Sequence, residues 1–167
     1  MKFIARLSGY FCILLVMITA TPVHAGSAAG TAIATITRFL SITHISELEF
    51  GTVSASSAAG SVVIDIQGNR FSTGGVVINP SGAFTPAKFV IQGKPNASFT
   101  VSLPNIVELR DTAGNSIAVD NIKSSLESGR LGDEGALEIT VGGQINLKAN
   151  QSTGDYSGIL VVELNYS

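Results

Sequence analysis

Apolar and polar residues alternate along most of the chain after residue 26, in short runs separated by turn-forming residues. In the clearest runs every second residue is apolar, which is the period of a strand with one buried face. These runs cover residues 62–67, 98–103, 137–141 and 160–166. Helical spacing is nearly absent, and the best helix candidate, residues 121–128, has too few apolar positions for a stable helix. The pattern predicts an all-β protein.

Turn signals separate the runs at the spacing of a β-sandwich. They fall at Gly68-Asn69 and at residues 79–82, 94–96, 112–115 and 152–155. We expect about nine strands in a single antiparallel, immunoglobulin-like β-sandwich. The run of Ala, Gly and Ser at residues 54–60 is expected to form a loop.

The first 25 residues have the order of a cleavable secretory signal peptide. Lys2 and Arg6 precede a short apolar run, and small residues precede a cleavage point after Ala25. The apolar run is too short for a membrane-spanning helix, which needs about 20 residues. We therefore expect an exported protein with three parts: a signal peptide at 1–25, an N-terminal arm at 26–38 and a β-sandwich at 39–167.

Composition excludes several classes of partner. The chain has 167 residues with 10 Lys and Arg against 12 Asp and Glu, and loss of the signal peptide would leave 8 basic residues. This mild negative charge does not favour nucleic acid. The one cysteine, Cys12, lies in the signal peptide, so the mature chain would have neither a disulfide nor a thiolate metal site.

Candidates for catalysis or metal binding are few. His44 is the one histidine after residue 25, and no G-x-S-x-G motif accompanies it, so a strand-edge histidine is the favoured interpretation. Gly129–Gly135 lacks the lysine and hydroxyl of a phosphate-binding loop. Asp133 with Glu134, or Asp111 near Asn115, could contribute to a calcium site, but neither follows the EF-hand pattern. We expect no enzyme and no cofactor.

Three local motifs resemble a known bacterial family. They are Leu40-Ser41-Ile42-Thr43 with residues 48–53, Ser72-Thr73-Gly74-Gly75-Val76, and Ala149-Asn150-Gln151 with residues 154–158 and the last strand. Together they resemble the secreted family called domain of unknown function 4402, over nearly all of residues 32–167. The ends of the chain are similar to those of spore-coat-U-type and chaperone-usher fimbrial subunits.

The fimbrial resemblance implies a pilin-like β-sandwich, and it implies roles for both ends of the chain. Tyr166 is penultimate and Gly154 lies fourteen places from the end, as in pilus subunits. It implies that the face made by Leu160, Val162, Leu164 and Tyr166 is gripped by a periplasmic chaperone, and that the arm face of Ala32, Ala34 and Ile36 completes another subunit's sandwich. Implied partners are that chaperone, an outer-membrane usher and further copies of the chain, joined by donor-strand exchange.

Two functions follow from these observations. The first is a non-enzymatic fimbrial or cell-surface structural subunit, assembled through its terminal strands after transit through the periplasm. The second is a self-contained extracellular module that binds carbohydrate or another ligand through loops such as Asn69–Gly75 or Gly129–Gly135. The absence of tryptophan argues against the second, because sugar sites generally use aromatic platforms.

Overall fold

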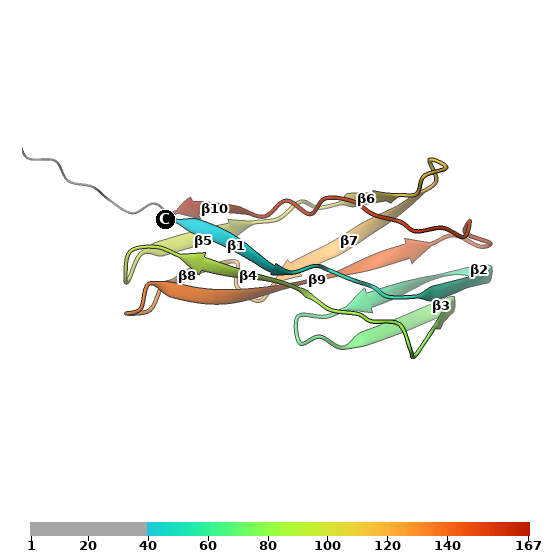
Figure 1. The fold of residues 1–167 in the computed structure, drawn as a ribbon, viewed down its shortest axis with the longest axis horizontal. Helices are drawn as coiled ribbons and strands as arrows, with labels where there is room; N and C mark the ends of the chain where they lie inside the picture. The colour runs from blue at the N-terminus through green and yellow to red at the C-terminus, as the bar shows by residue number, and fades with distance from the viewer. Residues whose placement is uncertain (1–39) are drawn as a thin grey trace, which may run out of the picture. The chain divides into compact units, whose positions relative to one another are not determined.

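A computed structural model describes residues 40–167, which form ten β-strands and contain no helix (Figure 1). All strand pairs are antiparallel, and they form two sheets in a sandwich-like arrangement. The all-β antiparallel prediction is confirmed. The strands are β1 (Ser41–Ser46), β2 (Val53–Ile64), β3 (Arg70–Ile78), β4 (Ala87–Gln92), β5 (Ser98–Ser102), β6 (Val107–Arg110), β7 (Ser116–Ser124), β8 (Ser128–Arg130), β9 (Ala136–Leu147) and β10 (Glu163–Tyr166).

Strand β9 organises the seven-stranded sheet, in which β1, β4, β9, β2 and β3 follow one another and β6 joins through β7. One edge of β9 pairs with β4 through residues 136–141 and with β2 through residues 143–147, while β7 lies along the other edge. Gly142 lies at the point on this edge where the partner strand changes from β4 to β2. A Cβ there would come 2.4 Å from the carbonyl oxygen of Ile64, so the close approach of the two backbones requires glycine.

The second sheet has the order β10-β5-β8 and carries the end of the chain. The pairing of β10 with β5 places Leu164 opposite Val101 and Tyr166 opposite Phe99. The last residue continues this contact, because the amide of Ser167 donates to the carbonyl of Ser98 at 3.3 Å. The first described strand, β1, therefore lies at one edge of the large sheet, and the last strand lies at an edge of the small one.

The core consists of two apolar clusters, one on each half of β9. Val62, Ile64 and Ile145 belong to the first cluster, and Ile91, Phe99 and Ile139 belong to the second. Two partly buried side chains, Leu48 and Ile122, pack against both clusters. These two side chains therefore mark the junction between the two halves of the core.

Two hairpin loops share one local design, D-x-x-G-N. Asp65 and Asp111 each accept backbone N–H groups two and four residues ahead with Oδ1, and the Asn amide with Oδ2. Such Asx turns mimic backbone turns and tolerate the following left-handed glycine. The pKa of each carboxyl group is lowered, chiefly by the side-chain hydrogen bond from Asn69 to Asp65 and from Asn115 to Asp111. Such a bond favours the ionised form of the carboxyl group.

The prediction of a loop at residues 54–60 is wrong, because these residues lie within β2. The pairing of β2 with β3 shifts between Ala55 and Gly60, which inserts extra residues opposite Gly75. A Cβ on Gly75 would lie 2.3 Å from the carbonyl oxygen of Ala58. The small residues therefore allow a tight bulge between two paired strands, and they do not form an open loop.

Candidate functional site

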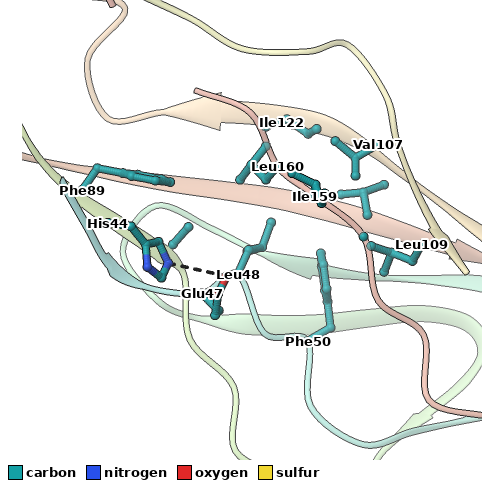
Figure 2. A pocket seen from close by; sticks show the side chains of 13 residues that line it. His44, Glu47, Leu48, Phe50, Phe89, Val107, Leu109, Ile122, Ile159 and Leu160 are labelled. Atoms are coloured by element: carbon teal, nitrogen blue, oxygen red, sulfur yellow. Dashed lines mark ion pairs between the residues drawn. The ribbon is translucent and has the colours of Figure 1, made fainter. Parts of the chain in front are cut away.

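A cavity of about 360 Å³, lined mainly by apolar residues and partly open, lies beside the junction of the two core clusters (Figure 2). Leu48 and Ile122, which contact both clusters, line it. Val107 and Leu109 contribute from β6, and Phe89 from β4. We call this space the seam cavity, because it separates the segment after β1 from the segment before β10.

Two titratable side chains lie in the wall of the seam cavity. His44 Nε2 is 3.5 Å from Glu47 Oε2, and the edge of the His44 ring meets Phe89 with ring centroids 5.5 Å apart (Figure 2). No Ser, Thr, Cys, Lys or Tyr lines the cavity among residues 40–167. His44 and Glu47 therefore have no nucleophilic side chain beside them in the cavity. They add a polar patch to a wall whose other side chains are apolar.

Arg70 fixes the backbone at Phe50, which forms one wall of the cavity. The guanidinium donates to the carbonyl of Phe50 at 3.1 Å through Nη1 and to the carbonyl of Asn79 at 2.9 Å through Nη2, and it stacks over the ring of Phe84 at 4.2 Å. Gly51 follows Phe50 with a φ of 73°, in the left-handed region that favours glycine. Together these contacts orient Phe50 toward the cavity.

The opposite wall belongs to the C-terminal segment, residues 157–166. Ser157 pairs with Arg110 through two backbone hydrogen bonds, and residues 163–166 pair with β5. Between these two attachments, residues 158–162 belong to no strand of the described chain. Leu160 packs against the core, whereas Ile159 is 83% exposed and Val161 54% exposed. Gly158, Ile159 and Leu160 line the cavity.

The structure brings three of the four predicted C-terminal residues onto the same core cluster and leaves the fourth exposed. Leu160, Val162 and Leu164 are partly buried against the second core cluster, and Tyr166 is 53% exposed. Only Leu164 and Tyr166 of these four lie within β10, so the regular strand is shorter than predicted. Gly154 lies in the connection before it, where an added Cβ would be 3.0 Å from Asp111 Oδ2.

The predicted signal peptide at 1–25 and the predicted arm face of Ala32, Ala34 and Ile36 lie outside the described residues.

Sequence reasoning missed the other wall of the cavity, made by Leu48, Phe50, Val107 and Leu109. The motif at residues 48–53 was noticed only as a family resemblance. Its apolar residues at positions 48 and 50 alternate with polar ones, which was the available signal.

The prediction of ligand-binding loops at Asn69–Gly75 and Gly129–Gly135 is wrong in part, because residues 70–75 lie within β3 and residues 129–130 lie within β8. Side chains in and beside these segments make internal contacts. Asn69 donates its side-chain amide to Asp65, and one face of Phe84 is covered by Arg70. Asp111, a calcium candidate, uses both carboxylate oxygens within its own loop, and Asp133 accepts from Asn96 Nδ2 at 3.2 Å. In residues 40–167 no three His, Cys, Asp or Glu side chains are grouped to hold a metal ion.

None of the described residues forms a helix that is both long and apolar enough to span a lipid bilayer.

These features define an all-β sandwich-like protein with a cavity between the first and last segments that the structure describes. The chain belongs to the family described as Domain of unknown function (DUF4402), whose model matches residues 40–166. The expected family is thereby confirmed, while the likeness to fimbrial subunits stays a prediction. No match was found among curated proteins or among solved structures.

Proposed function

We propose that the protein is a secreted, non-enzymatic structural subunit of a fimbria or cell surface, which assembles with other copies through its terminal β-strands. The observation that supports this proposal is the seam cavity, whose wall includes Leu48 and Ile122, the side chains that pack against both halves of the core. Strand addition to an incomplete sandwich uses backbone hydrogen bonds for affinity and pockets for alternate side chains for specificity.

The cavity is partly open to solvent, and a strand placed in it would cover side chains of its wall such as Ile159, which is 83% exposed. Full burial of one such residue is worth about 1.5–3 kcal/mol. Whole domains are stable by about 5–15 kcal/mol. A subunit with this space unfilled is therefore at risk during export, and a periplasmic chaperone followed by an outer-membrane usher are the partners we propose.

The N-terminal arm of another copy is the proposed occupant in the assembled state. Its face of Ala32, Ala34 and Ile36 presents two methyl groups and one large side chain, worth roughly 3–5 kcal/mol if buried. Alternation at these positions is what a strand filling an apolar groove requires. Ile33, the other large apolar residue of the arm, falls on the opposite face.

This difference between the two faces allows a matched test of assembly. Light scattering and electron microscopy would follow assembly of the mature chain, residues 26–167, with Ile36→Asp and Ile33→Asp as paired variants. We expect assembly to be lost in the Ile36 variant and retained in the Ile33 variant. A labelled peptide of residues 28–38 should also bind the Ile36 variant. A mature chain that stays a monomer and does not bind the peptide would contradict the proposal.

Thermal stabilisation of a monomeric mature chain by small apolar compounds, with no binding of the arm peptide, would favour the second candidate, a module that binds small apolar ligands. The seam cavity lies within the range of about 300–1,000 Å³ common for small-molecule pockets. Thermal stabilisation by glycans, with no effect of the arm peptide, would instead favour a carbohydrate-binding module.

A further inference from the structure

A titratable side chain, His44, lies in the wall of the seam cavity and is the one histidine of residues 26–167 (Figure 2). In β1 it pairs with Phe89 of β4, two positions from the pair of Ile42 with Ile91, so it stands on the side of the sheet that faces the core. Its side chain is nevertheless 45% exposed, with the seam cavity in front of it. Any occupant of the cavity would therefore cover an imidazole ring that can take up a proton.

Among the described residues, Glu47 supplies the one acidic group of the cavity wall. Its Oε2 lies 3.5 Å from His44 Nε2, and its side chain is 84% exposed. The other lining residues come from β4, β6, β7, the segment 48–50 and residues 158–160, and all are apolar or glycine. The nearby Lys88 of β4 does not line the cavity and binds Glu138 at 3.0 Å. The wall therefore has one negative charge when His44 is neutral, and protonation of His44 cancels it.

The arm that we propose as the occupant has a charge complementary to this wall. Residues 26–38 contain one charged side chain, Arg38, and no acidic one. Neutral His44 leaves the Glu47 carboxylate free to attract the arm, and protonated His44 offsets that attraction. The apolar face of the arm would also remove water from an imidazolium without offering it an acceptor, which is unfavourable. The ion pair of His44 with Glu47 compensates little, because both groups are exposed.

We propose that protonation of His44 expels the arm from the seam cavity, so that assembly through the terminal strands is weakened in mildly acidic solution. This inference rests on the proposed function, because the arm of another copy is the occupant. Histidine is the side chain whose charge ordinarily changes between about pH 5 and 8. A complex that excludes the proton loses affinity by the factor to which protonation depletes the neutral form, which is about tenfold one pH unit below the ordinary histidine value of about 6.5.

The pH dependence of peptide affinity tests this proposal. The receptor is the mature chain, residues 26–167, carrying Ile36→Asp, and the labelled peptide of residues 28–38 is acetylated and amidated so that it has no titrating group in this range. We expect its dissociation constant, measured by fluorescence anisotropy, to rise about tenfold between pH 8 and pH 5.5. In His44→Asn the ratio of the two constants should fall to about one. A parent ratio below two, or the same ratio in His44→Asn, would overturn the proposal.

Proton NMR of the His44 ring gives an independent reading, because this ring is the one imidazole of the receptor. Its titration midpoint should fall by at least one pH unit when the peptide is bound, and an unchanged or higher midpoint would overturn the inference.

Paired carboxylate variants test the charge argument. Glu47→Gln should weaken binding at pH 8, whereas Glu49→Gln, at an exposed residue outside the cavity wall, should not, and equal effects would contradict the inference. Failure of the peptide to bind at any pH would contradict the proposed function itself, whereas binding that does not depend on pH contradicts this inference alone.

Discussion

Replacing Ile159 with alanine should separate the stability of a single subunit from the strength of its assembly. Ile159 lines the seam cavity, yet 83% of the residue is exposed in the isolated chain. Full burial of an isoleucine is worth about 1.5–3 kcal/mol. Because only a small part of that burial exists in one subunit, truncation should lower its free energy of unfolding by less than about 0.5 kcal/mol.

A strand placed in the cavity would bury much of what remains exposed. Alanine keeps one methyl group, so the loss on binding should be about 1–2 kcal/mol. That corresponds to roughly 5- to 30-fold weaker binding, since about 1.4 kcal/mol is tenfold. Fluorescence anisotropy with a labelled peptide of residues 28–38, on the chain carrying Ile36→Asp, measures the affinity, and urea unfolding measures stability.

The control for this prediction is Ile106→Ala, which removes a comparably exposed side chain that does not line the cavity. It should change neither affinity nor stability beyond about 0.5 kcal/mol. The reasoning is refuted if Ile159→Ala binds the peptide as tightly as the parent. It is also refuted if the substitution lowers the free energy of unfolding and leaves the peptide affinity unchanged.

Three further predictions concern the scaffold. Ile139→Ala, at a side chain with no exposed surface, should lower the free energy of unfolding by about 2–5 kcal/mol in denaturant titrations; a loss below 1 would show that the core can collapse around it. Arg70→Ala should cost about 1–3 kcal/mol by removing hydrogen bonds to two carbonyls, and should also weaken peptide binding through Phe50; unchanged binding would contradict its positioning role. Asp65 has a lowered folded pKa, so its stabilising contribution is present above the unfolded value of about 3.9 and is lost as pH falls through the folded pKa. Asp65→Asn should therefore be less stable at pH 7 and lose less stability between pH 5 and 2, as measured by thermal unfolding; parallel pH curves for parent and variant would contradict this.

Local patterns in the sequence were sufficient for the fold class and for most chain reversals. The run at 137–141 lies within β9, and the Gly68-Asn69 turn lies in a hairpin, because side-chain alternation and turn chemistry act over a few residues. Half of the run at 62–67 was predicted wrongly, because β2 ends at Ile64 and residues 65–67 belong to the hairpin loop. The family resemblance was carried by similarly local motifs and is confirmed over residues 40–166.

Tertiary structure alone decided which edges pair and where the core is incomplete. Residues 54–60 have no hydrophobic period, yet the backbone around them pairs with β3, since small residues permit a bulge that larger ones would block. The seam cavity brings together His44, Phe89, Val107 and Ile159 from distant parts of the sequence. Each is an ordinary strand or loop residue by local pattern. Their meeting depends on β9 dividing one edge between β4 and β2, which is settled by packing between strands and not by any single segment.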